Sequence, residues 1–203
     1  MSLIVGTTTN NKTRTLIPEG THYARCISVV DMGTADAEWQ GQVKKRKTVR
    51  FTFEFPKHTA VFREEDGPQP LGRSVKYTNG FSQKGRLRPE LEKWRGKSFT
   101  ADELLSFDLA SVLGHPCLAT IVHVQGRDGQ TVDRISGLSS VPEDMPSTPA
   151  VNELFTYDVD EHPKNFDRVP AWMREEILAC DELAHLNGNS ETKPEVATNE
   201  VPF

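Results

Sequence analysis

The chain has 203 residues, 36% of them hydrophobic, and carries a net charge of -5; this length suits one well-buried core with appended segments rather than two full domains. No apolar run approaches the roughly 18 residues of a membrane helix, and the first residues lack the basic start and apolar stretch of a signal peptide, so we expect a soluble, cytoplasmic protein. Cys26, Cys117 and Cys180 are widely spaced and predict buried, reduced thiols rather than a disulfide framework or a zinc site.

Three strands are predicted in the first part of the chain. Residues 1–15 are polar and predict a flexible N-terminal arm. A first strand runs from about Ile17 to a turn signal at Asp31. The second is the clearest, because Val49 to Phe55 alternate between apolar and polar residues. A third strand is predicted at about 73–81.

A helical region and a hairpin complete the predicted domain. Pro89 suits a first helical turn, and Thr100 to Glu103 match a capping box. Strands at 116–124 and 130–138 flank a Gly-rich turn. Three strands, a helical connection and a two-stranded hairpin follow the order of a five-stranded oligonucleotide-binding (OB) barrel, and other small barrels have the same strand count. We therefore predict a mainly β OB-fold domain over residues 16–142.

The C-terminal part is predicted to be a linker with one additional helix, over residues 143–185. Prolines and acids follow Val141, as in a linker. A helix is expected at about 168–184, with an apolar stripe formed by Met173, Ile177, Cys180 and Ala184. Residues 186–203 offer nothing to bury and predict a disordered acidic tail.

Charge is distributed unevenly along the chain. Residues 42–97 hold 15 Lys and Arg against 6 Asp and Glu, whereas the remaining residues have a net charge of -14. A groove of cations with interleaved aromatic rings is what a single nucleic-acid strand requires, since cations follow the backbone and rings stack on bases. The residues predicted to contact DNA are Trp39, Lys44, Lys45, Arg46, Lys47, Arg50, Arg73, Lys76, Tyr77, Phe81, Lys84, Arg86, Arg88 and Trp94.

Two alternatives apply to this basic segment. Lys and Arg also solvate strand edges and loops without binding anything. Aromatic residues are more often core than stacking platforms, and Phe51, Phe53 and Phe55 are expected to be core because they share one face of a strand.

The C-terminal residues are predicted to bind partner proteins. Glu200, Val201, Pro202 and Phe203 place apolar groups at the end of a polar tail, where only a partner could bury them; a chance ending is the alternative. These four residues resemble the acidic tip of bacterial and bacteriophage single-stranded DNA-binding proteins, although Thr198 and Asn199 stand where that family has further aspartates. The resemblance implies an OB domain that holds DNA and a tip that recruits replication, recombination and repair proteins.

The predicted function is therefore non-catalytic, largely sequence-independent binding of single-stranded DNA, in host cytoplasm if the protein is phage-encoded. No cofactor and no membrane association are expected, and self-association and RNA binding are left open. His115, Cys117 and His123 lack a second ligand pair at metal spacing, and no catalytic motif occurs. The alternatives are an adaptor of the replication machinery that does not bind DNA, and a metal-dependent nuclease that uses acids near Asp158.

Overall fold

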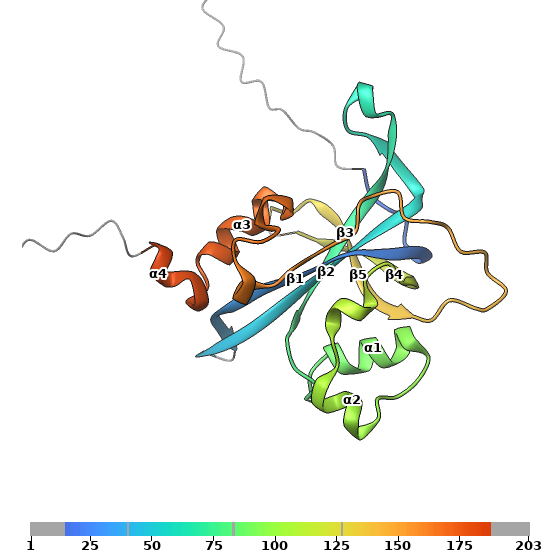
Figure 1. The fold of residues 1–203 in the computed structure, drawn as a ribbon. Coiled ribbons are helices and arrows are strands. Elements are labelled where there is room, and N and C mark those ends of the chain that lie inside the picture. Colours follow the sequence, from blue (N-terminus) through green and yellow to red (C-terminus); the bar gives the residue numbers. More distant parts are fainter. Residues whose placement is uncertain (1–14, 40, 83, 127, 188–203) are drawn as a thin grey trace, which may run out of the picture.

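The computed structural model describes residues 15–39, 41–82, 84–126 and 128–187, which form one sheet with helices at its margins (Figure 1). The sheet order is β3-β2-β1-β4-β5, antiparallel throughout, and β6 pairs parallel with β1. The strands are β1 (Gly20–Trp39), β2 (Gln42–Val61), β3 (Pro68–Thr78), β4 (Pro116–Gln125), β5 (Thr131–Ser139) and β6 (Phe155–Tyr157). The helices are α1 (Leu87–Arg95), α2 (Ala101–Ser106), α3 (Ala171–Leu178) and α4 (Ala184–Asn187).

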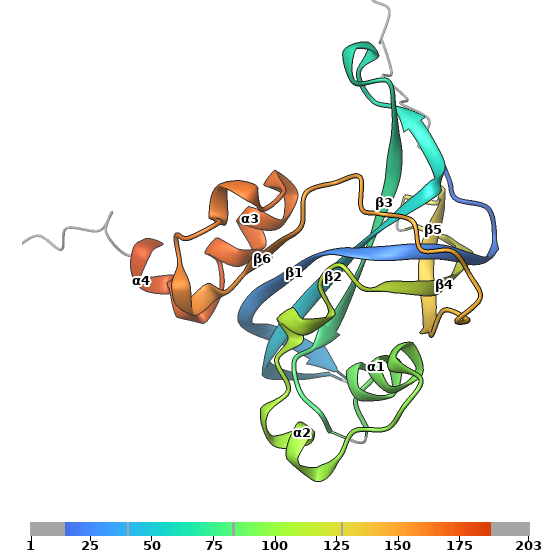
Figure 2. The ribbon, with the colours of Figure 1, turned by 45° about the vertical axis from the view of Figure 1, so that its right-hand side comes forward.

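The five predicted strands and the helical connection between β3 and β4 are confirmed in their order, but the sheet is open rather than a closed barrel. Figure 2 shows α1 and α2 at one end of the sheet and the β2–β3 hairpin projecting from the other. Within the described ranges no helix is both long and apolar enough to span a membrane. β6 was not predicted, because three residues are too few to display a strand periodicity.

Alternation in β2 builds the main core. Phe51, Phe53 and Phe55 are fully buried on one face of the strand, as expected from their spacing of two residues. The ring of Trp94 from α1 packs edge-on against Phe53, with centroids 5.3 Å apart. The sheet therefore buries its apolar face against the helical connection.

Three side chains fix that connection in place. Thr100 and Glu103 form the predicted capping box: Glu103 donates its backbone N–H to Thr100 Oγ1 (3.2 Å), and Thr100 donates its own to the Glu103 carboxylate (2.9 Å). Glu90 on α1 is buried and accepts from the backbone N–H of Leu138 at 3.0 Å. This bond ties α1 to β5.

A second apolar cluster lies on the opposite side of β1. Val30 and Met32 of β1 pack against Met173 and Ile177 of α3 and against other apolar side chains from residues 157–183. The predicted single helix over 168–184 is wrong in extent, because α3 ends at Leu178 and a 3₁₀ turn precedes α4. In that 3₁₀ turn, Glu182 accepts two hydrogen bonds from Thr34, both 2.7 Å long.

The linker after β5 is held against the sheet. Glu54 on β2 is fully buried, and its carboxylate accepts hydrogen bonds from the backbone N–H groups of Val151 and Asn152, each 2.9 Å long, and from the Asn152 side chain at 2.7 Å. A buried carboxylate requires such donors. The linker is therefore a strap across the outer face of β2.

A buried ion pair bridges the two edge strands of the open sheet. Arg73 on β3 donates from Nε to Asp133 on β5 at 2.6 Å, and both side chains are almost completely buried. Asp133 also accepts from the backbone N–H of Ile17 at 2.7 Å, and Arg73 donates to the carbonyl of Thr15 at 2.7 Å. The pair thus links β3, β5 and the segment that enters β1.

We expect D133A to lower the free energy of unfolding by about 3–5 kcal/mol, because it leaves the Arg73 guanidinium buried without its counter-ion. Urea unfolding of the full chain measures the change. The control, K164A, removes the exposed Lys164–Glu161 ion pair and should cost less than about 1 kcal/mol. Equal losses in the two variants would contradict the role assigned to Asp133.

Two histidines connect β1 with the irregular part of β2. His22 Nε2 lies 2.8 Å from the carbonyl of Pro18, which can only accept, so His22 Nδ1 is the acceptor for His58 Nε2 at 2.9 Å. Burial, with the neighbouring His22, lowers the pKa of His58 below its ordinary value of 6.5. His58 is therefore mainly neutral in the folded protein at neutral pH.

This pair predicts a pH-dependent stability. Because the unfolded chain protonates His58 more readily than the folded one, the free energy of unfolding should fall as the pH drops below 6.5. Urea titrations at pH 7.5, 6.5 and 5.5 on wild type and H58Q test it. H58Q should show the shallower decline, and parallel curves would count against the assignment.

Candidate functional site

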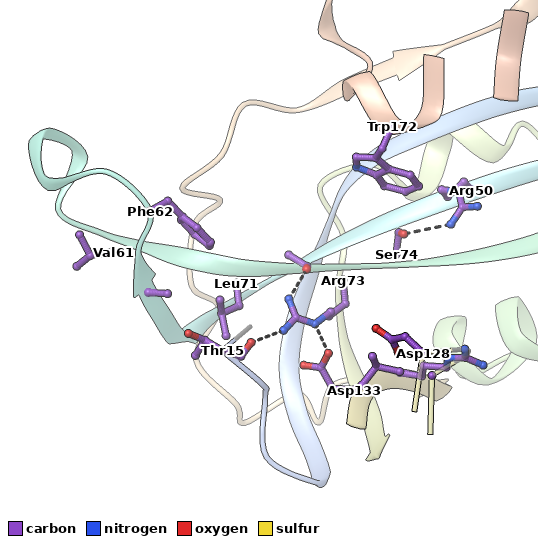
Figure 3. A pocket seen from close by; sticks show the side chains of 15 residues that line it. Thr15, Arg50, Val61, Phe62, Leu71, Arg73, Ser74, Asp128, Asp133 and Trp172 are labelled. Atoms are coloured by element: carbon purple, nitrogen blue, oxygen red, sulfur yellow. Dashed lines mark hydrogen bonds and ion pairs between the residues drawn. The ribbon is translucent and has the colours of Figure 1, made fainter. Parts of the chain in front are cut away.

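A groove with a volume of about 1060 Å³ lies where β2 and β3 meet the β4–β5 turn and the start of α3 (Figure 3). Its walls combine exposed aromatic and aliphatic side chains with cations. The lining residues are Thr15, Arg50, Ala60, Val61, Phe62, Leu71, Gly72, Arg73, Ser74, Gly126, Asp128, Val132, Asp133, Arg134 and Trp172.

Two aromatic rings border the groove from different elements. Trp172, in the first turn of α3, is 58% exposed, and Phe62, just after β2, is 63% exposed. α3 exposes Trp172 because it buries Met173 and Ile177, which are four residues apart and face the apolar cluster. Figure 3 places both rings on the same side of the β2–β3 ribbon. Each ring therefore offers a face to a flat ligand.

Arg50 is the central cation of the groove. It projects from the polar face of β2, lies over the Trp172 ring at 5.0 Å from its centroid, and donates to Ser74 Oγ at 3.3 Å. Its NH2 lies 3.5 Å from a carboxylate oxygen of Glu176. Burial lowers the pKa of Arg50 below its ordinary value, and Glu176 opposes that shift, so the guanidinium remains charged at neutral pH.

One N–H group of Arg50 has no partner among the described residues, and Arg134 is a second cation that lines the groove. The Nε of Arg50 is buried and has no hydrogen-bond partner among the described residues. Arg134 on β5 is exposed and also lines the groove. Arg73, on the floor, is neutralised by Asp133. The groove thus presents two cations beside two exposed rings.

Several predicted DNA-binding cations are paired with acids instead. Lys45 lies 2.8 Å from Asp181 and 3.1 Å from Asp36. Lys47 lies 2.9 Å from Asp31 and 3.5 Å from Asp160. Lys76 pairs with Glu176, Arg88 with Glu92, and Arg73 with Asp133. Of these, only Arg73 is buried: it is 8% exposed on the floor of the groove and is paired with Asp133, and its role as a DNA contact stays a prediction.

Tyr77 and Trp94 are not base-stacking platforms. They are 3% and 5% exposed, because the face of β3 and α1 that carries them points into the main core. Trp94 donates its indole N–H to the carbonyl of Pro116 at 2.7 Å. Phe81 is half-buried, with Phe99 and Phe107 at centroid distances of 4.9 and 5.8 Å. These aromatics stabilise the fold.

The remaining predicted residues are dispersed. Lys44, Lys84 and Arg86 are exposed and Arg46 is half-buried; none of them lines the groove. The side chain of Trp39 and the segment Glu200–Phe203 lie outside the described residues. Sequence reasoning missed Trp172, Phe62 and Arg134, and the one available signal was that Trp172 falls outside the apolar stripe of its helix.

The residues considered for chemistry have structural roles. Asp158 accepts from the backbone N–H of Asp160 at 2.9 Å, and Glu161 pairs with Lys164 at 2.8 Å. Over the described ranges, no three His, Cys, Asp or Glu side chains group as a metal site. All three cysteines are free and buried, and burial raises the pKa of Cys26 to about 12.

The different positions of the two tryptophans predict different costs of removal. W94A should lower the free energy of unfolding by about 3–5 kcal/mol, because it opens a cavity in the main core. W172A should cost no more than about 1 kcal/mol, since it loses only an exposed cation–π contact. Urea unfolding of both variants measures these losses in the free energy of unfolding. A large loss for W172A would mean that this ring is structural.

Comparison with known proteins identifies no relative. A scan against family models, a search of curated proteins and a search of solved structures each give no match. The functional argument for this chain therefore rests on the geometry of the groove.

Proposed function

We propose that the protein binds single-stranded DNA, largely independently of sequence, in the groove between β2–β3, the β4–β5 turn and α3. One observation carries the proposal: the exposed ring of Trp172 lies beside the Arg50 guanidinium, and the groove also exposes Phe62 and Arg134. Rings stack on bases of any sequence, and cations contact the phosphates between them. Base stacking of this kind requires unpaired bases, which favours single strands over duplex.

The topology supports the same function. We propose that β1 to β5, with the sheet order β3-β2-β1-β4-β5 and helices between β3 and β4, form an OB-type fold, in which the barrel is partly open. OB folds bind oligonucleotides on the face of their second and third strands, near the turn between the fourth and fifth. The groove occupies those positions.

The dimensions of the groove favour a chain-like ligand. Its volume of about 1060 Å³ lies slightly above the roughly 300–1,000 Å³ typical of small-molecule pockets. Exposed apolar and aromatic side chains at its rim suit a ligand that continues beyond it. Recruitment of replication, recombination or repair proteins through Glu200–Phe203 is a separate proposal, which rests on the sequence of that segment.

Fluorescence anisotropy with labelled oligo-dT tests the DNA proposal. Wild type should bind, and W172A and F62A should each weaken binding by about 1–3 kcal/mol, the contribution of one stacked base. R50A should weaken binding and make the slope of log K against log salt shallower by about 0.7. Duplex DNA should bind much more weakly, and oligo-U shows whether RNA is accepted.

Two variants serve as controls. K97A removes a cation that lines a separate pocket beside Trp94, and L105A removes an exposed apolar side chain on α2; both should bind like wild type. Wild type that fails to bind oligo-dT at low salt would support an adaptor instead. Magnesium-dependent cleavage of the strand would support a nuclease.

A further inference from the structure

The cations on the outer face of β2 and β3 are held by acids from the C-terminal part of the chain. Glu176 on α3 contacts both Lys76 and Arg50, Asp181 contacts Lys45, and Asp160 contacts Lys47. These acids lie 100 or more residues from their partners in the sequence. Carboxylates therefore already occupy positions in which a nucleic acid would place phosphates.

Glu176 differs from the other two acids because one of its partners lines the groove. Arg50 lines the groove directly, and Lys76 is the residue opposite Arg50 in the β2–β3 register. Trp172 and Glu176 are four residues apart, so they share a face of α3 and lie over the same part of the sheet. One helix face thus presents both an aromatic ring and a competing anion.

We propose that Glu176 is a built-in competitor for phosphate at Arg50 and Lys76 and thereby sets the affinity and salt dependence of the groove; this inference rests on the proposed binding of single-stranded DNA. A phosphate that reaches Arg50 exchanges with the Glu176 carboxylate instead of pairing with a free cation.

The exchange does not require α3 to leave the sheet. Met173 and Ile177 hold the helix in the second apolar cluster, whereas the side chains of Glu176 and Lys76 are each about one third exposed (37% and 34%). An ion pair as exposed as Glu176–Lys76 contributes little to stability; the Arg50 side chain is 16% exposed. A rotation of the Glu176 side chain toward solvent therefore suffices to release the cations.

E176Q tests this inference in the full chain, with E175Q as the matched control. Glu175 is exposed on the same helix, its substitution changes the net charge equally, and no ion pair is recorded for it within the described part of the chain. E176Q should bind oligo-dT about three- to tenfold more tightly than wild type at low salt. Its salt slope should steepen by about 0.7 for each cation that gains a phosphate.

The outcomes separate this inference from the proposed function. If E176Q binds no more tightly than wild type, or if E175Q gains as much, Glu176 is not a competitor, while the effects of R50A and W172A still report on the groove. If wild type and E176Q both fail to bind, the proposed function itself fails. Thermal unfolding should place E176Q within about 3 °C of wild type, and E176A with E175A repeats the comparison with a shorter side chain.

Discussion

The buried pair of Arg73 and Asp133 is the interaction on which the architecture depends. An open sheet has two edge strands with unpaired backbone groups, and here the pair bridges them at 2.6 Å and also binds the segment before β1. A buried ion pair requires a partner for each charge, because desolvation is costly. Its position forms the floor of the groove, so the constraint that joins the edges also shapes the candidate site.

The same pair explains why charge composition was an incomplete guide to the site. Residues 42–97 carry an excess of cations, but Arg73 is neutralised inside the fold, and Lys45, Lys47 and Lys76 meet acids from β1 or from residues 160–181. Ion pairing between distant segments is a product of the tertiary fold and leaves no local pattern in the sequence. A local excess of Lys and Arg therefore shows how many cations a segment carries. Which of them are free to bind a ligand depends on the ion pairs that the fold creates.

Local signals predicted local structure well. The alternation of β2 and the capping box of α2 act through neighbouring residues, and the structure confirms both. The groove combines side chains from β2, β5 and α3, so no periodicity could reveal it. The two tryptophans illustrate this dependence on the tertiary fold. Trp94 is buried by its contacts with β2 and β4, whereas Trp172 is exposed because its helix turns a different face to the core.

A groove that is partly neutralised by its own chain has a physical consequence for selectivity. Where a cation is free, any polyanion gains from contact with it, and duplex and single strands are bound alike. Where a carboxylate already holds the cation, as Glu176 holds Arg50 and Lys76, phosphate contact exchanges one anion for another and contributes less. Under the proposed function, discrimination then shifts to the rings of Trp172 and Phe62, which can stack only on unpaired bases. The acid on α3 and the aromatic residue one turn before it thus favour the same class of ligand.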